Sequence, residues 1–241
     1  MKVLITSGGT KVPIDSVRHI ANMSSGNFGS KIATEILRNG HEVVFMRRKG
    51  SKSPMSVNID LMEELYDMYK FSSWFNERMG MMSHYGEVVY ETFDGYAEKL
   101  ELLVREENFD VIILAAAVSD YGVKNYTDGK IRSNDSLSIQ LKPLPKLISR
   151  VKSWSPKSKL VGFKLLVDST QQQLIEASQK SIDENNCDMV VANDLRDIKN
   201  NQHKLLLVRQ AKFGLSVDEY PSLDSDPNFL AKVVAKSIEN L

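Results

Sequence analysis

The sequence has very few residues that cross-link a chain or bind a metal. It contains one cysteine, Cys187, and four histidines among 241 residues. A single cysteine excludes an internal disulfide framework and fits a reducing compartment, which favours a cytoplasmic location. The histidines and the cysteine lack the spacing of metal ligands, so we predict no dedicated metal site. We expect Cys187 to be a small buried residue rather than a nucleophile.

The chain also lacks net charge and long apolar runs. It has 31 basic and 31 acidic residues, so no overall field attracts nucleic acid or a membrane surface, and anion recognition must be local. No apolar stretch approaches the roughly 20 residues that a membrane span needs. The opening "MKVLITSGGT" has no long apolar core and no cleavage site, and is typical of a buried strand rather than a signal peptide.

Apolar runs and helical patterns alternate along the chain. Strands are expected at 3–6, 41–46, 88–93, 109–121, 159–166 and 188–194, and helices at about 24–39, 95–108, 144–153, 170–185 and 226–239. This alternation predicts an α/β fold, a doubly wound, Rossmann-like, mostly parallel sheet with helices on both faces. We expect a single domain, 1–241, with a partly helical insertion at about 49–86, a flap or hairpin at about 121–142, and a further hairpin near 204–217.

Two clusters of small residues flank the connection from the first strand to the first helix. The strand ends in Gly8 and Gly9, and Ser24, Ser25 and Gly26 lead into the helix. Glycines allow close backbone approach and a helix N-terminus is partly positive, so both clusters are expected to bind phosphates. The long insert between them makes the match to a dinucleotide fingerprint poor. A turn that needs glycine for geometry alone would look the same.

The fourth expected strand ends in "LAAAVSDY". Ala115 and Ala116 leave room for a flat ligand at the strand end where such sheets bind ligands. Asp120 follows at the edge and would accept hydrogen bonds from an amino group. Tight packing of a helix on the sheet, with an aspartate that begins a turn, explains these residues equally well.

Two short motifs carry further polar residues. "DGKIRS" places Lys130 and Arg132 on one side of a presumed strand, where two cations would neutralise a polyphosphate. Taken alone, such a pair is more often a solvated edge. "RHIAN" supplies Arg18, His19 and Asn22, residue types that in a loop are more often turn chemistry than catalysis.

A strand–glycine–helix start also suggests an NAD(P)-dependent short-chain reductase. Such enzymes pair a tyrosine and a lysine four residues apart on a helix, and Tyr66 with Lys70 and Tyr126 with Lys130 have that spacing. The first pair precedes the strand that this chemistry should follow, and the second straddles a turn. The second strand ends in "FMRRK", without the acidic residue that holds the ribose. A non-catalytic nucleotide-binding module stays open, but it gives the polar loop residues no task.

Together these segments resemble the phosphopantothenoylcysteine synthetase family, the phosphopantothenate–cysteine ligases of coenzyme A biosynthesis. The matching pieces occur in the family's order between residues 6 and 195: "TSGGT", "PIDSVRHIANMSSGNFG", "AAAVSDY", "GKIRS", "PKLI", "VGFKL" and "VVANDL". The long "PIDSVRHIANMSSG" motif is highly specific, whereas the others would be weak alone. The chain resembles a stand-alone ligase, without the flavin-dependent decarboxylase that many bacteria fuse to it.

The resemblance implies a two-step reaction of 4′-phosphopantothenate and cysteine. A nucleoside triphosphate, accompanied by Mg²⁺ with few dedicated protein ligands, activates the carboxylate as an acyl nucleotidylate and releases pyrophosphate. The amine of cysteine then attacks and gives the amide and the nucleoside monophosphate. The family forms homodimers, which implies a second copy of the chain as partner.

The resemblance also implies roles for single residues. Asn22 matches the asparagine that contacts the acyl nucleotidylate, and Lys130 matches a flap lysine important at the activated carboxylate, so both are expected to be catalytic. Arg18, His19 and Arg132 are expected to bind the substrate together with Asn22. The residues expected to bind the nucleotide are Gly8, Gly9, Ser24, Ser25, Gly26, Ala115, Ala116, Asp120, Lys146, Phe163 and Lys180.

The choice of nucleotide depends on where the chain departs from the fused bacterial enzymes. "LPK" at 144–146 stands where they carry Asn-Pro-Asp and is closer to the eukaryotic pattern, as is the insertion at 49–86. Bacterial members favour CTP and eukaryotic members ATP. "VVANDL" and Lys180 are bacterial in character, so CTP is favoured, with ATP as the alternative.

Overall fold

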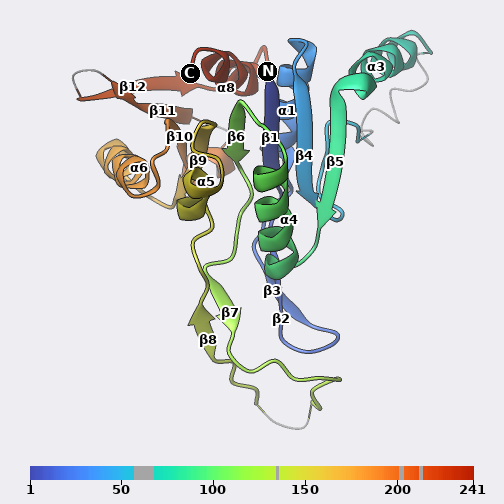
Figure 1. Ribbon diagram of the computed structural model, residues 1–241, viewed down its shortest axis with the longest axis vertical. Helices are drawn as coiled ribbons and strands as arrows, with labels where there is room; N and C mark the ends of the chain where they lie inside the picture. The colour runs from blue at the N-terminus through green and yellow to red at the C-terminus, as the bar shows by residue number, and fades with distance from the viewer. Residues whose placement is uncertain (57–67, 134–135, 201–203, 212–213) are drawn as a thin grey trace.

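An eight-stranded sheet forms the centre of the molecule. The computed structural model describes residues 1–56, 68–133, 136–200, 204–211 and 214–241. The strands stand in the spatial order β12-β11-β10-β9-β6-β1-β4-β5 (Figure 1). Their bounds are β1 (Lys2–Ser7), β4 (Glu42–Arg48), β5 (Tyr85–Tyr90), β6 (Val111–Leu114), β9 (Lys159–Leu166), β10 (Met189–Asp194), β11 (Lys204–Ala211) and β12 (Gly214–Pro221).

The strands from β10 across to β5 pair in parallel, whereas β11 and β12 add an antiparallel hairpin at one edge. This order confirms the predicted doubly wound, Rossmann-like, mostly parallel sheet, and the hairpin near 204–217 is β11–β12. The direction of winding reverses between β1 and β6, because the chain passes from β1 to β4 on one side and returns to β6 on the other.

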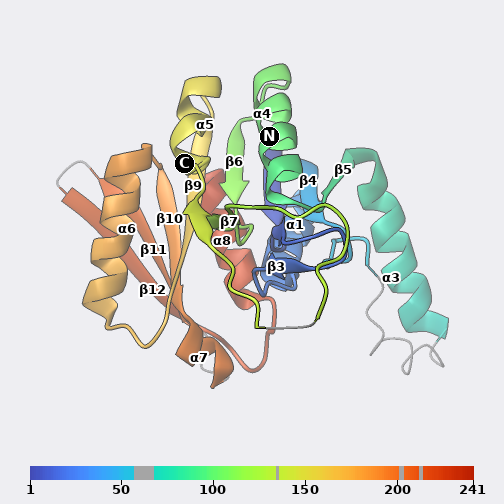
Figure 2. The same ribbon diagram turned by 90° about the horizontal axis from the view of Figure 1, so that it is seen from below.

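Helices cover both faces of the sheet (Figure 2). Helices α1 and α8 pack against each other on one face, while α4, α5 and α6 form a row on the other. Helix α3 and the short η1 lie beyond the β5 edge, and α7 follows β10 (Figure 1). The bounds are α1 (Asn27–Arg38), α3 (Met68–Met81), η1 (Met82–His84), α4 (Phe93–Glu106), α5 (Ile148–Trp154), α6 (Gln171–Asn185), α7 (Leu195–Lys199) and α8 (Phe229–Glu239).

The apolar run of β1 contributes side chains to two separate cores, one on each face of the sheet. Val3 and Ile5 belong to the core under α1 and α8, and Leu4 between them belongs to the core under α4, α5 and α6. Successive side chains of a strand point to opposite faces, so a strand covered on both sides needs an unbroken apolar run. Each fully buried side chain of this size contributes about 1.5–3 kcal/mol.

Three element boundaries differ from the sequence prediction. The helix predicted from about residue 24 begins at Asn27, with Gly26 as its N-cap, and Ser25 Oγ accepts from Asn27 N at 3.3 Å. Strand β5 covers 85–90 rather than 88–93, so its first residues lie within the segment at 49–86 that showed no strand signal. It ends early because Thr92 caps α4 and accepts from Gly95 N. The helix predicted from 144 begins at Ile148, since the prolines nearby favour extended backbone.

Two small hairpins project below the carboxyl ends of the strands (Figure 1). The first is β2 (Lys11–Pro13) with β3 (His19–Ala21), and the second is β7 (Tyr121–Val123) with β8 (Leu141–Pro143). The second pair lies within the predicted flap, whose described residues between the two strands are not helical. We call residues 11–21 and 121–143 together the extension.

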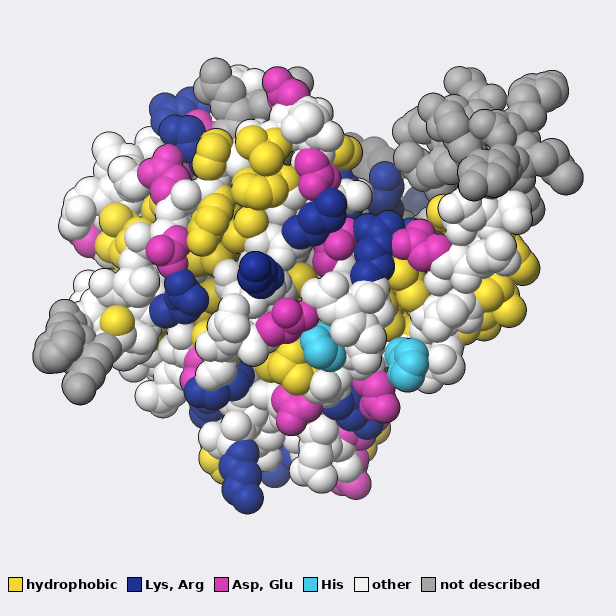
Figure 3. Space-filling model, turned by 90° about the horizontal axis from the view of Figure 1, so that it is seen from above, with side chains coloured by type: hydrophobic (Ala, Val, Ile, Leu, Met, Phe, Trp, Pro, Cys, Tyr) yellow, Lys and Arg dark blue, Asp and Glu magenta, His cyan; other side chains and the backbone are white. Residues whose placement is uncertain are grey.

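At the opposite end of the sheet, the described residues mix charges of both signs (Figure 3). Viewed from above, lysine and arginine side chains lie beside aspartate and glutamate, with apolar side chains between them (Figure 3). This mixture agrees with the equal numbers of basic and acidic residues. Among the described residues, no helix is both long and apolar enough to cross a membrane.

Candidate functional site

The ends of β1 and β6 lie side by side where the winding of the sheet reverses. The pairing continues past both strands, because Ala117 N donates to Gly8 O at 2.8 Å and Thr10 N donates to Ala117 O at 3.1 Å. Open α/β sheets bind ligands in the crevice at such a reversal, outside the carboxyl ends of the strands.

The two clusters of small residues meet at this crevice. Gly8 (φ 85°) and Gly26 (φ 76°) both have left-handed backbone, which glycine adopts without strain. A Cβ placed on Gly26 would lie 3.4 Å from Gly8 N, so the turn after β1 touches the start of α1. A Cβ placed on Gly9 would lie only 2.3 Å from Asn22 O. The turn after β1 therefore packs against both the Gly26 turn and the loop that carries Asn22.

A chain of hydroxyl groups ties Asn22 to the end of β6. Ser119 Oγ donates to Asn22 Oδ1 at 2.7 Å and lies 2.9 Å from Thr10 Oγ1, and Ser119 N also donates to Thr10 Oγ1 at 2.9 Å. Since the Ser119 hydroxyl has one proton and gives it to Asn22, Thr10 must donate to Ser119. This arrangement engages the carbonyl end of the Asn22 side chain and leaves its NH₂ group to donate elsewhere.

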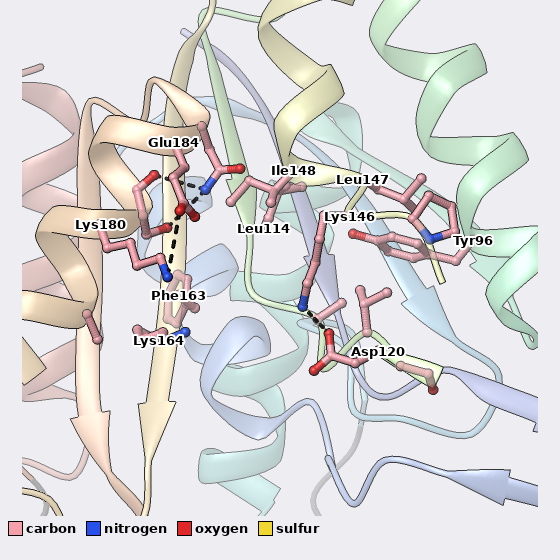
Figure 4. A pocket seen from close by; sticks show the side chains of 17 residues that line it. Tyr96, Leu114, Asp120, Lys146, Leu147, Ile148, Phe163, Lys164, Lys180 and Glu184 are labelled. Carbon is pink, nitrogen blue, oxygen red and sulfur yellow. Dashed lines mark hydrogen bonds and ion pairs between the residues drawn. The ribbon is translucent and has the colours of Figure 1, made fainter. Parts of the chain in front are cut away.

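A pocket of about 450 Å³ opens next to this chain of hydroxyl groups. Its wall comes from the ends of β6 and β9, from α4 and α6, and from the segment that enters α5 (Figure 4). The residues expected to bind the nucleotide that line it are Ala116, Asp120, Lys146, Phe163 and Lys180. The other residues that were expected to bind the nucleotide are not part of its wall; they are Gly8, Gly9, Ser24, Ser25, Gly26 and Ala115.

Two of the three lysines that line the pocket are paired with exposed carboxylates. Lys146 Nζ donates to Asp120, and Lys180 Nζ lies 3.7 Å from a carboxylate oxygen of Glu184 (Figure 4). These side chains are mostly exposed, and exposed ion pairs contribute about 0–1 kcal/mol. An anionic ligand can therefore replace the carboxylates at small cost, so the two lysines suit a phosphate group. Phe163 adds an apolar surface and meets Phe28 of α1 edge to face at 6.2 Å.

The other predicted site residues lie on the extension. His19 is exposed in β3, and Lys130 and Arg132 are exposed in the flap. Arg18 joins the two parts, because its Nη2 donates to Ile131 O at 2.7 Å. None of these four predicted residues lines the pocket.

Several residues at the pocket were missed by the sequence reasoning. They are Tyr96, Ser119, Lys164 and Glu184. Ser119 and Lys164 stand inside the motifs "AAAVSDY" and "VGFKL". The sequence therefore indicated these segments as part of the site, but it gave no role to these two residues. Tyr96 carries no such signal, because only the packing of α4 across the sheet brings it to the pocket. Burial raises the pKa of Tyr96 to about 12, so its hydroxyl keeps its proton at neutral pH.

The features that would support other chemistries are weak in the described part of the chain. No group of three or more His, Cys, Asp or Glu residues there could hold a metal ion. Burial raises the pKa of Cys187 to about 11, which leaves a neutral thiol that is a poor nucleophile. Tyr126 and Lys130 lie in the non-helical flap, so they do not share a helix face. Tyr66 of the other candidate pair lies outside the described residues.

Sequence and structure comparisons agree on one family. The DNA/pantothenate metabolism flavoprotein C-terminal domain family matches residues 1–76 and 97–238. A coenzyme A biosynthesis bifunctional protein CoaBC of Thermococcus kodakarensis is 35% identical over 86% of this chain, which spans only 44% of that relative. Phosphopantothenate–cysteine ligase 1 of Arabidopsis thaliana is 31% identical over 80% of the chain and 69% of its own length.

A solved structure has the same fold throughout. The DNA/pantothenate metabolism flavoprotein from Streptococcus pneumoniae superposes with a TM-score of 0.78 and 28% identity, covering 100% of this chain and 99% of that one. The family match takes in both glycine clusters, the "LAAAVSDY" segment and the flap. The chain therefore belongs to the DNA/pantothenate metabolism flavoprotein C-terminal domain family.

Proposed function

We propose that the chain is a phosphopantothenate–cysteine ligase of coenzyme A biosynthesis. The names of its relatives point to this activity. The observation that carries the proposal is the pocket, where five residues expected to bind a nucleotide line one cavity and Ser119 in its wall holds Asn22. A nucleotide-binding cavity beside a fixed amide group suits the activation of a carboxylate.

The proposed reaction has two steps. The carboxylate of 4′-phosphopantothenate attacks the α-phosphorus of the nucleoside triphosphate, and the bond to pyrophosphate breaks with its electron pair leaving on pyrophosphate. The cysteine amine then attacks the acyl carbon, and the bond from that carbon to the phosphate oxygen breaks. The nucleoside monophosphate leaves with that electron pair, and the amine gives up one proton.

Different residues of the site would bind the phosphates and stabilise the charge that develops during the reaction. The backbone N–H groups of the Gly8 and Gly26 turns would receive phosphate oxygens, with Lys146 and Lys180 as cations at the pocket wall. The free NH₂ group of Asn22 would donate to the acyl oxygen, on which negative charge grows during attack. Lys130, with Arg132, would neutralise the phosphate that leaves. Donors aimed at developing charge contribute most when they are fixed before the reaction, and the Ser119 hydroxyl fixes Asn22.

Of the two nucleotides, we favour CTP, with ATP as the alternative. The support is the bacterial character of "VVANDL" and of Lys180, which lines the pocket. The described residues offer no cluster for a resident metal, so Mg²⁺ is proposed as a counter-ion carried by the triphosphate.

We also propose that the partner is a second copy of the chain. Apolar side chains are exposed along the extension, which is unusual for a segment that faces water alone. They are Val17, Ile20, Tyr121, Tyr126, Leu137, Ile139 and Leu141. Sedimentation at several protein concentrations measures the assembly, and a chain that stays monomeric at every concentration would contradict this proposal.

The ligase proposal is tested by supplying 4′-phosphopantothenate and cysteine with CTP or ATP in separate reactions. We expect pyrophosphate and the nucleoside monophosphate in equal amounts, with the amide product. Release of a nucleoside diphosphate and inorganic phosphate would contradict a nucleotidylate intermediate. Oxidation of NADPH with a carbonyl substrate would instead favour a reductase.

A substitution at Asn22 tests the chemistry separately from binding. Asn22→Asp keeps an acceptor for Ser119 but removes the NH₂ donor, so turnover should fall about 10²–10³-fold. Nucleotide affinity, measured by calorimetry, should change little. Asn228→Asp, at the N-cap of α8 and not part of the pocket wall, is the matched control. Unchanged turnover in Asn22→Asp would remove this side chain from the mechanism.

A further inference from the structure

The turn between β2 and β3 is fastened to the flap through backbone groups. Ser16 N donates to Gly129 O at 3.0 Å, and Gly129 N donates to Ser16 Oγ at 2.9 Å. Thr127 N donates to Ile14 O at 3.2 Å. The stretch of flap just before Lys130 is therefore held by the hairpin and not by a regular strand.

Asp15 lies at the centre of this contact. Its side chain is fully buried, although it carries a charge. Oδ1 accepts from Val17 N at 2.9 Å and from Arg18 N at 2.7 Å, and Oδ2 accepts from Ile131 N at 3.1 Å. One carboxylate thus shapes its own turn and reaches across to the flap.

Arg18 completes the contact from the same turn. Its Nη2 donates to Ile131 O, and its Nε lies 3.5 Å from Asp15 Oδ2. The N–H and the C=O of Ile131 are therefore both bound to the β2–β3 turn. These two groups belong to the peptide units that join Ile131 to Lys130 and to Arg132, so the backbone on both sides is fixed.

The chemistry of the contact requires a carboxylate. A carboxylate offers only acceptors, and here both oxygens face N–H donors. An amide in its place would turn an NH₂ group toward one of those donors and lose that bond. Burial raises the pKa of Asp15, but the N–H groups of Val17, Ile131 and Arg18 and the Arg18 charge outweigh it, so the pKa is lowered and the group stays ionised at neutral pH.

We infer that Asp15 is a positioning residue that holds Lys130 and Arg132 in place for the reaction by binding the Ile131 peptide. This inference rests on the proposed function for the role of the two cations. The bond between Asp15 and Ile131 does not depend on that function, so the two can be tested apart. Asp15 itself touches no reacting atom in this assignment.

The first experiment measures hydrogen exchange in Asp15→Asn and in the wild-type chain. Hydrogen bonds to charged groups are strong, so the Ile131 amide should exchange about 10–100-fold faster in the variant. Peptides from β1 and β6 should stay protected, which shows that the fold persists. Asp188→Asn is the matched control, because Asp188 also accepts from a backbone amide, Leu160 N at 2.9 Å, but stands directly before β10. In that control the exchange rate of the Ile131 amide should equal the wild-type rate.

A milder variant covers the case in which Asp15→Asn does not fold. Ser16→Ala removes the hydroxyl that accepts from Gly129 N. Because Ser16 is exposed, the substitution should not disturb the core. Exchange at Gly129 should rise about two- to tenfold, as expected for the loss of one neutral hydrogen bond. Asp128 Oδ1 also accepts from Gly129 N, at 3.0 Å, so the decisive variant combines Ser16→Ala with Asp128→Ala. Unchanged exchange at Gly129 in that double variant would show that the turn does not hold the flap and would overturn the inference.

The second experiment measures ligase kinetics of the same variants. A group displaced by about 1 Å costs up to 10²-fold in rate, so kcat of Asp15→Asn should fall about 10–100-fold while the KM for nucleotide changes little. Lys124→Gln, which changes another lysine of the flap, is the control, and its kcat should equal that of the wild-type chain. Faster exchange at Ile131 with unchanged kcat would overturn the positioning role. Absence of ligase activity in the wild-type chain would overturn the proposed function instead, and the exchange experiment would still decide whether Asp15 holds the flap.

Discussion

The sheet and the extension are stabilised by different interactions. In the sheet, strands such as β1 and β6 are buried on both faces, and their contribution comes from apolar area removed from water. The extension is held together by two short antiparallel strand pairs and by hydrogen bonds from side chains to the backbone, while several of its apolar side chains are exposed. The difference indicates that the sheet provides most of the stability, while under the proposed function the extension carries groups that act in the reaction.

The same contrast appears in the glycines of the two regions. Gly86 lies in β5, where an added Cβ would meet only Val44 at 3.9 Å. Gly9 lies where the sheet meets the extension, and an added Cβ there would run into backbone. A site formed by the close approach of two loops tolerates less change than the strands behind it.

The largest effect is expected in the sheet. Ile113 is fully buried in β6, so Ile113→Ala should lower the free energy of unfolding by about 2–5 kcal/mol. Ile139→Ala in the exposed flap should change it by no more than about 0.5 kcal/mol. Urea denaturation measures both. Equal losses would break the contrast, and a loss at Ile139 that grows with protein concentration would show that a second copy covers the flap.

The next effect is on turnover and should arise in the extension. Lys130→Gln removes an exposed cation proposed to act on the leaving phosphate, so kcat should fall about 10²–10³-fold. Thermal unfolding should be unchanged, because the side chain is exposed. Lys124→Gln in the same flap is the control. If both variants lose the same activity, general positive charge rather than one placed lysine would be the cause.

A smaller effect is expected where the two regions meet. In Gly9→Ala the new methyl group would lie 2.3 Å from Asn22 O, and crowding of this kind costs about 1–3 kcal/mol. We expect lower stability together with reduced ligase turnover, because the loop of Asn22 must move. Gly86→Ala should show neither change. Chemical denaturation and the pyrophosphate assay on both variants provide the measurement, and a fully active Gly9→Ala would contradict the close packing.

The smallest effect concerns acid stability and arises at Asp194, a buried carboxylate at the end of β10. Asp194 accepts from the hydroxyl and amide of Ser169 and from Arg196 N, which lowers its pKa to about 2. A carboxyl with a lowered pKa stabilises the fold above its unfolded pKa of about 3.9, and the contribution is lost as pH falls toward the folded value. The stability difference between the wild-type chain and Asp194→Asn should thus be largest above pH about 4 and shrink toward pH 2. A difference that does not vary with pH would contradict the assigned bonds.

Much of the sheet could be predicted from the sequence for a physical reason. The run around Leu4 and the run around Ile112 are unbroken, which only a strand covered on both faces requires. The apolar pattern does not give the exact ends of the elements, because these depend on capping bonds such as that from Gly95 N to Thr92 Oγ1. The hairpin β2–β3 gave no signal, since its strands are three residues long and its turn forms hydrogen bonds with the flap, which is more than 100 residues away in the chain.

The sequence by itself determined the α/β class, the parallel sheet and the motifs that mark the family, because periodicity and motif spacing are properties of the chain. Only the tertiary structure decided that Gly8 touches Gly26, that Ser119 holds Asn22, and that Asp15 binds the backbone beside Lys130. These contacts join residues far apart in the chain, and they depend on the angle at which loops leave the sheet. That angle is set by packing on both faces, which no local pattern records.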